Sequence, residues 1–173
     1  MKLSYQGIQD KQGYAAAQVA LPQYDWAKMA EKTAEKPVWV HFGAGNIFRG
    51  FIAALQQRLL NEGLADRGII AADTFDYDII DKIYTPYDNL TMNVTLNPDG
   101  TTSREIIGSV AEGLRANSAD AEMMARFKQI FTDPGLQMIS FTITEKGYGV
   151  APADLERGLT PVLAMGKVTA LLY

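Results

Sequence analysis

The sequence contains no cysteine and only one histidine, and these absences exclude several kinds of functional site. Without cysteine the chain cannot form a disulfide scaffold, and it lacks the thiolate that serves as a nucleophile or a metal ligand. A single histidine, His41, leaves little from which to build a zinc site or a Ser-His-Asp triad. We therefore expect no metal site, and we assign no catalytic residue in this chain.

Long hydrophobic runs and an excess of positive charge are also missing. No segment approaches the roughly 20 consecutive apolar residues of a membrane span, and the N-terminus has no apolar core of the signal-peptide type. The net charge is −4 and the lysines and arginines are scattered, which argues against a nucleic-acid partner. We expect a cytoplasmic protein of 173 residues with one sizeable core and with neither a membrane nor a nucleic-acid partner.

The sequence does contain a glycine-rich turn between an apolar run and a helix-compatible stretch. Val38-Trp39-Val40 leads into Gly43-Ala44-Gly45, and a helical pattern follows. This order lets a backbone approach a phosphate, because Gly43 permits a tight turn and Gly45 keeps side-chain atoms away from a ligand. The helix N-terminus then offers N–H groups to the anion. Phe48 stands where the usual fingerprint has its third glycine, so the spacing alone does not distinguish a dinucleotide loop from an ordinary turn.

The remaining hydrophobic patterns predict an α/β fold with a parallel sheet and helices around it. Alternating residues on either side of an Asn97–Gly100 turn predict an antiparallel hairpin, either inserted or at the sheet edge. The first long helix is expected to bury its bulky apolar residues, which are Phe48, Phe51, Ile52, Leu55 and Leu59. Strands are expected at 37–42, 69–73 and 137–144, and hairpin strands at 90–96 and 101–110. Helices are expected after Asp25, at 46–61, 76–83, 119–131 (capped by Asn117 or Ser118) and 152–173.

Several polar residues are expected at the carboxyl ends of the parallel strands, where ligands of such sheets bind. Asp73 closes the second strand, where a carboxylate can accept from both hydroxyls of a ribose; its alternative role is to cap the helix that follows. Arg49 can offer its guanidinium to a phosphate or pair with a neighbouring carboxylate. Glu145 and Lys146 follow a buried strand on a loop that could carry chemistry or a solvated ion pair. His41 is expected to be a packed core residue.

Two of these segments together resemble a known family. Residues 41–50 (His-Phe-Gly-Ala-Gly-Asn-Ile-Phe-Arg-Gly) and residues 140–148 (Ser-Phe-Thr-Ile-Thr-Glu-Lys-Gly-Tyr) resemble the mannitol dehydrogenase family, the polyol-specific long-chain dehydrogenases. The resemblance covers residues 36–173 and is strongest to the mannonate oxidoreductase (fructuronate reductase) branch. It implies a Rossmann-type domain that binds NAD, followed by a helical domain. It also implies hydride transfer between the nicotinamide and a sugar acid or polyol.

The resemblance also assigns cofactor-binding residues. Asp73 matches the acidic position that favours NAD, because a 2′-phosphate beside its carboxylate would be repelled. The family's catalytic lysine, with its asparagine and histidine, lies in the later helical domain and has no counterpart here. The residues that match the family's cofactor site are Gly43, Gly45, Asn46, Phe48, Arg49, Asp73, Thr144 and Glu145.

These matches and departures give the expected organisation. We expect an N-terminal extension at 1–35, a dinucleotide-binding domain at 36–150, and a terminal helix at 151–173 that leads towards a missing helical domain. That domain, or a partner chain, would cover an unpaired sheet edge and an apolar face at 160–173. Two alternatives remain open at this point: a nucleotide-binding or interaction module without chemistry of its own, and a binder of flavin or S-adenosylmethionine.

Overall fold

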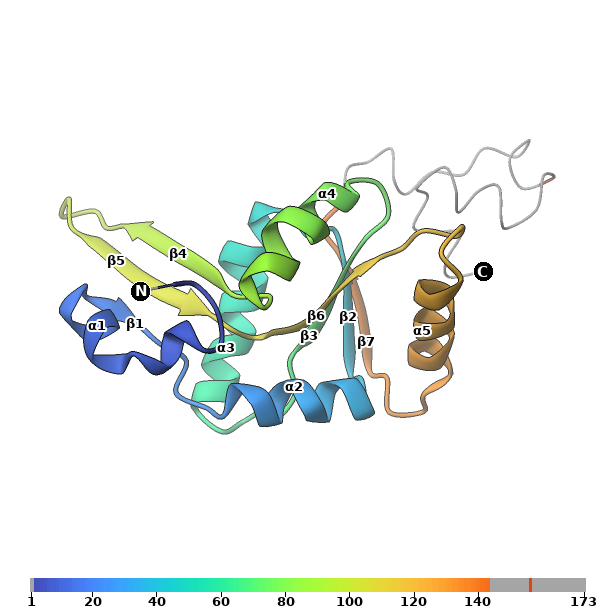
Figure 1. Ribbon diagram of the computed structural model, residues 1–173, viewed down its shortest axis with the longest axis horizontal. Helices are drawn as coiled ribbons and strands as arrows, with labels where there is room; N and C mark the ends of the chain where they lie inside the picture. Colours follow the sequence, from blue (N-terminus) through green and yellow to red (C-terminus); the bar gives the residue numbers. More distant parts are fainter. Residues whose placement is uncertain (1, 144–155, 157–173) are drawn as a thin grey trace.

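The computed structural model describes residues 2–143 and 156, and a four-stranded parallel sheet forms its centre (Figure 1). The strands lie side by side in the order β6-β3-β2-β7. Counted along the chain, the third, second, first and fourth strands of this sheet are neighbours in that order, which is the strand order of a Rossmann fold. The strands are β2 (Trp39–Phe42), β3 (Ile69–Asp73), β6 (Val110–Arg115) and β7 (Met138–Phe141).

Helices cover both faces of this sheet, as expected for the predicted fold class (Figure 1). On one face, Ile69 and Ala71 of β3 pack against the helices that follow β2 and β3. On the other face, Val40 and Phe42 of β2 pack against Phe127 of α5. The first face carries α3 (Ala53–Asn61) with the π-helical turn η2 (Phe48–Ile52), α4 (Tyr77–Ile79) with η3 (Ile80–Tyr84), and the short η4 (Thr85–Tyr87); the second carries α5 (Ala121–Thr132).

One strand of the parallel sheet, β6, was not predicted, and the predicted end of the second hairpin strand was wrong. The expected strand 101–110 divides at Gly108 and Ser109, where the chain leaves one sheet and enters the other. A side chain at Gly108 would lie 3.0 Å from the Trp26 ring, so the chain passes close to the N-terminal segment here. Apolar residues stand on both sides of Gly108 and Ser109, so the change of direction between them was not predicted.

The antiparallel hairpin is confirmed as an insertion with a small sheet of its own. β4 (Thr91–Leu96) pairs antiparallel with β5 (Thr102–Ile107), and β1 (Val19–Ala20) adds a parallel edge. The N-terminal segments η1 (Gly7–Gln9) and α1 (Lys11–Ala16) pack over this sheet through Ile8 and Tyr14, which cluster with Val19 of β1 and Ile106 of β5. The hairpin thereby rests on N-terminal residues as well as on the main domain.

Three of the described helices begin at aspartate side-chain caps, and the first is α1, where Asp10 accepts a hydrogen bond from the Gly13 N–H. Asp25 accepts a hydrogen bond from the Lys28 N–H and starts α2 (Trp26–Glu35), as predicted. Asp120 accepts from the Met123 N–H and starts α5. The predicted caps, Asn117 and Ser118, instead belong to the turn before that helix.

The predicted helix at 46–61 is present, but its buried face differs from the prediction. Phe48 is fully buried, whereas Ile47, Phe51, Leu55 and Leu59 are between 42% and 70% exposed and recur every four residues. We call these four residues the apolar stripe. Apart from Leu60, the positions of α3 that face the protein are held by small or polar side chains, which are Ala53, Ala54, Gln56 and Gln57.

Buried glutamines explain why the bulky residues point outward. Gln57 donates to the carbonyl of Ile106 at 2.8 Å and accepts from the N–H of Gly108 at 2.7 Å. Gln56 donates to the carbonyl of Arg67 at 2.7 Å. These bonds provide partners for backbone groups that would otherwise be buried without hydrogen bonds. An apolar side chain at either position could not form them, and the unpaired groups would destabilise the fold.

Some expectations fall outside the described residues. They concern the predicted helix at 152–173 with its apolar face, and the residues Thr144, Glu145 and Lys146. Within the described residues, no helix has the length and apolar character needed to cross a membrane. The proposed division at residues 35 and 150 stays a prediction.

Candidate functional site

The glycine turn lies where β2 ends and the 46–61 helix begins, at the carboxyl edge of the sheet. β2 is the strand at which the order reverses, because β3 lies on one side of it and β7 on the other. Such a reversal leaves a crevice between the connections that depart in opposite directions. The turn therefore occupies the position at which Rossmann folds bind their ligands.

The two glycines of the turn have different physical reasons to be glycine. Gly43 has a φ of +100°, and a side chain there would lie 2.3 Å from the carbonyl oxygen of Thr142. The fold itself requires that glycine. At Gly45 a Cβ would meet no atom of the described residues within 4 Å, and φ is not in the left-handed region. Nothing in the described fold requires a glycine at 45, and the open space beside it suits a ligand.

The peptide group between Gly43 and Ala44 is held at both ends. Its carbonyl accepts a hydrogen bond from the Thr142 hydroxyl at 2.9 Å, and its N–H donates to Asp73 Oδ2 at 3.2 Å. The next carbonyl, that of Ala44, accepts from the hydroxyl of Tyr84 at 2.9 Å. Tyr84 is buried, and burial raises the pKa of its phenol, so it stays a neutral donor. Side chains from β3, from η3 and from the residue after β7 thus fix two successive peptide groups of the turn.

Asp73 closes β3, as predicted, and its carboxylate already has three backbone partners. Besides the Ala44 N–H, it accepts from the N–H groups of Phe75 and Asp76 at 2.9 and 2.8 Å through Oδ1. Phe75 and Asp76 both precede α4, whose N-cap is Asp76 without a side-chain cap bond, so the predicted alternative role of Asp73 as the cap of that helix is not seen. A carboxylate offers about four lone-pair sites, so these bonds leave room for one further donor.

Arg49 and Asn46 lie on the first turns of the helix. Arg49 donates to Asn46 Oδ1, and its guanidinium lies 6.0 Å from the centre of the Tyr84 ring. Its Nε has no hydrogen-bond partner among the described residues, although it is buried. No carboxylate pairs with Arg49 within the described part of the chain, so of its two predicted roles the ion pair is not seen there.

His41 is a packed core residue, as expected. It is fully buried, and its ring stacks on Phe48 with centroids 4.2 Å apart. Burial lowers its pKa to about 4, against the opposing effect of the Gly43 carbonyl, so it is neutral near pH 7. Phe48, which stands at the place of the third glycine, has its side chain in the core. It could contribute to a ligand site only through its backbone.

The sequence reasoning missed two residues of this site. Tyr84 follows an ambiguous segment far along the chain from the glycines, and no local pattern connects it with them. Thr142 sits at the end of a strand whose apolar neighbours concealed its role, although its alternation with Ser140 was a usable signal. Of the remaining predicted site residues, Thr144 and Glu145 lie outside the described part. Within that part no cluster of three or more metal-ligating side chains occurs.

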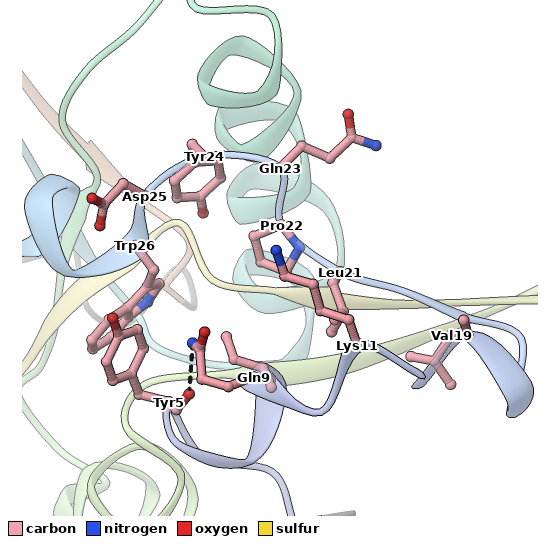
Figure 2. Close-up of a pocket in the computed structure, with 12 residues that line it drawn as sticks. Tyr5, Gln9, Lys11, Val19, Leu21, Pro22, Gln23, Tyr24, Asp25 and Trp26 are labelled. Carbon is pink, nitrogen blue, oxygen red and sulfur yellow. Dashed lines mark hydrogen bonds between the residues drawn. The ribbon is translucent and has the colours of Figure 1, made fainter. Parts of the chain in front are cut away.

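A separate hollow of about 780 Å³ lies over the N-terminal segment (Figure 2). The rings of Tyr5 and Trp26 stack there with centroids 4.8 Å apart, and Gln9 donates to the Tyr5 carbonyl. Asp25, which also lines it, is engaged as the cap of α2. None of the predicted site residues lines this hollow, so its large volume does not make it the better candidate.

Known proteins similar to this chain are oxidoreductases. The chain is 44% identical over its whole length to D-mannonate oxidoreductase from Thermotoga maritima, of which it covers 34%. It is 30% identical over 90% of its length to polyol:NADP oxidoreductase from Gluconobacter oxydans, of which it covers 33%. No protein-family model matches the chain.

A solved structure supports the fold. The mannitol 2-dehydrogenase of Pseudomonas fluorescens, in a ternary complex with NAD and D-mannitol, matches 99% of this chain with a TM-score of 0.75 and 22% identity. The chain covers 34% of that structure and about a third of the length of the curated relatives. It belongs to the mannitol dehydrogenase family and corresponds to the N-terminal part of its relatives.

Proposed function

We propose that this chain binds NAD at the glycine turn and forms the nucleotide-binding part of an oxidoreductase. The reaction would be hydride transfer between the nicotinamide and a sugar acid or polyol, similar to mannonate or fructuronate. The observation that carries this proposal is the Gly43–Gly45 turn. It lies at the reversal of strand order, its peptide groups are held by Thr142, Asp73 and Tyr84, and the space beside Gly45 is open.

The residues around the turn fit the pyrophosphate of a dinucleotide. The first N–H groups of the 46–61 helix lack acceptors within the helix, and its dipole favours an anion. Arg49 adds a positive charge on the same turn, and its buried Nε still lacks a partner among the described residues. The absence of a side chain at Gly45 leaves room for the phosphates. When bound, the cofactor would supply the hydride acceptor or donor.

Asp73 would bind the ribose of the adenosine half. Its carboxylate lies at the end of β3 beside the turn, and its orientation is fixed by three backbone N–H groups. A 2′-phosphate at that position would meet a like charge. One relative is named for NADP, so membership of the family does not by itself decide between the two cofactors. The charge of Asp73 is the reason to favour NAD.

Proton transfer would come from outside the described residues. Oxidation of a secondary alcohol requires a base for the hydroxyl proton and a donor for the developing oxyanion. His41 cannot be that base, because it is buried and both of its ring nitrogens have partners. We place the base in the additional two thirds of sequence that the relatives carry. We therefore expect this chain alone to be inactive.

The apolar stripe supports the same view. Four large apolar side chains exposed on consecutive turns of one helix are unusual on a surface that stays in water. We propose that polypeptide equivalent to the rest of the relatives covers this stripe and completes the enzyme.

Binding of NAD is tested with Gly45→Val. The Cβ atom would have space in the fold, so the variant should keep the circular dichroism of the parent. Its branched side chain would occupy the place of the phosphates, and calorimetry should show at least a tenfold loss of NAD affinity. Gly50→Ala in the same helix is the control, because its Cβ would make only an ordinary contact of 3.6 Å with Asn93. Equal NAD affinity of parent and Gly45→Val would refute the proposed phosphate site.

Inactivity of the isolated chain is tested by following NADH production from mannonate and mannitol. We expect none from the chain alone, and activity once polypeptide equivalent to the rest of the relatives is supplied. Activity of the pure chain that is lost in Lys146→Ala would place the catalytic base in this chain instead. If NAD binds but supplementation never restores turnover, the chain is a nucleotide-binding module without chemistry.

A further inference from the structure

Four hydrogen bonds join the strand ends to the glycine turn through His41. The indole N–H of Trp39 donates to Ser140 Oγ at 2.6 Å, and Ser140 Oγ lies 2.7 Å from His41 Nδ1. On the other side of the ring, His41 Nε2 lies 2.9 Å from Thr142 Oγ1, and that hydroxyl donates to the Gly43 carbonyl at 2.9 Å. All of these side chains come from β2, β7 or the residue that follows β7.

Elementary valence fixes the position of every proton in this series. A carbonyl only accepts, so the single hydroxyl proton of Thr142 points to Gly43, and its lone pair must accept from His41. His41 therefore carries its proton on Nε2, and Nδ1 is an acceptor. The hydroxyl of Ser140 fills that acceptor while its own lone pair takes the indole N–H, which can only donate. Each proton has one acceptor, and each acceptor that the series uses is filled.

We propose that His41 is a positioning residue for the nucleotide-binding turn: its neutral, Nε2-protonated ring orients Thr142, which holds the Gly43 carbonyl. The proposal rests on the function proposed above for that turn. Turning the Gly43–Ala44 peptide plane would break the Thr142 bond at one end and the Asp73 bond at the other. The stacked ring of Phe48 prevents the imidazole from tilting away. The turn is therefore ordered before a ligand arrives, so less conformational entropy is lost when the ligand binds.

The protonation state can be observed directly, because His41 is the only histidine of the chain. Nitrogen-15 NMR of uniformly labelled protein at pH 7.5 should show one histidine ring with its proton on Nε2 and a bare Nδ1. A ring with its proton on Nδ1, or one that exchanges between both tautomers, would overturn the proposal. This measurement does not depend on NAD, so it stands even if the chain binds no nucleotide.

The positioning effect is tested with Thr142→Val, which keeps the shape of the side chain and removes the hydroxyl. We expect NAD affinity to fall about tenfold, since one charge-neutral hydrogen bond of the binding turn is lost. Thr142→Ser should restore the affinity. The matched control is Thr33→Val, because Thr33 is also buried and hydrogen-bonded, to Met29 and Gly68, but lies away from the turn.

A second readout separates this proposal from the proposed NAD function. Amide exchange of Ala44 should be faster in Thr142→Val than in the parent and unchanged in Thr33→Val, because its N–H belongs to the clamped peptide. If NAD does not bind the parent but Ala44 behaves in this way, the proposed cofactor fails and the positioning role holds. Unchanged exchange in Thr142→Val, or no recovery in Thr142→Ser, would show that the hydroxyl does not hold the turn.

Discussion

Acidification should destabilise this chain through His41 in a defined pH window. Burial lowers the pKa of His41 from its ordinary 6.5 to about 4 in the folded chain. The unfolded chain therefore binds a proton at higher pH than the folded chain does. The contribution of neutral His41 to the free energy of unfolding is fully present above about pH 6.5. It decreases as the pH falls towards 4, and below that His41 causes no further change.

The size of this effect follows from the same two values. A pKa difference of 6.5 against about 4 corresponds to about 3 kcal/mol when the whole window has been crossed. Between pH 7 and pH 5, most of that window is covered, and the free energy of unfolding should decrease by about 2 kcal/mol. This is a large fraction of the stability of an ordinary domain.

The assay is urea unfolding at pH 7, 6 and 5, followed by circular dichroism on the parent and on His41→Gln. Glutamine cannot titrate, and its amide can still donate to Thr142. Carboxylates with lowered pKa values, such as Asp66 beside Lys32, titrate mainly below this window and are common to both proteins. We expect the parent to lose about 2 kcal/mol more than the variant between pH 7 and pH 5. Parallel pH dependence of the two proteins would refute the argument that His41 is buried as a neutral group.

Three further outcomes are expected. Asp73→Asn should lower the preference for NAD over NADP about tenfold in calorimetry, because the charge that repels a 2′-phosphate is removed, whereas damage to the turn would weaken both cofactors. An unchanged ratio of the two affinities would show that Asp73 does not contact the ribose. Tyr84→Phe should cost about 1 kcal/mol in urea unfolding, because the carbonyl of Ala44 loses its donor, and a neutral effect would contradict that bond. Glu112→Gln should lower the free energy of unfolding by about 1–3 kcal/mol, because it leaves the partly buried Arg126 without its ion pair. If parent and variant are equally stable in high salt, the ion pair behaves as an exposed one and the argument from burial is wrong.

Much of the fold could be predicted because local sequence patterns coincide with the elements they specify. The run before Gly43, the run that ends at Asp73, and the cap at Asp25 each combine an apolar or capping signal with a clear boundary. The hairpin was likewise visible through its turn and its alternation. These features depend on residues close together in the chain.

Other features depended on contacts between distant residues. Phe51, Leu55 and Leu59 of the apolar stripe were predicted to be buried, because periodicity cannot tell which face of a helix packs against the sheet. The buried face is determined by Gln57, because it bonds to Ile106 and Gly108, which lie 49 and 51 residues further along the chain. In the site, the glycines and Asp73 could be predicted from their order along the chain. Tyr84 and Thr142 could not, because only the folded sheet brings them to the turn.

The π-helical turn at Phe48–Ile52 makes the 46–61 helix sensitive to length. There the N–H of Ala53 bonds to the carbonyl of Phe48, so the turn holds one residue more than an α-helical turn would. Each residue of an α-helix advances the phase by about 100°. Deleting one residue here, such as Gly50, would return the turn to α-helical spacing and leave the flanking segments in phase, whereas inserting a further residue would rotate the first turn by about 100° against the part that packs on the sheet. A single-residue loss should therefore be tolerated at this turn as well as at the hairpin tip, Asn97–Gly100, and a single-residue gain only at the hairpin tip.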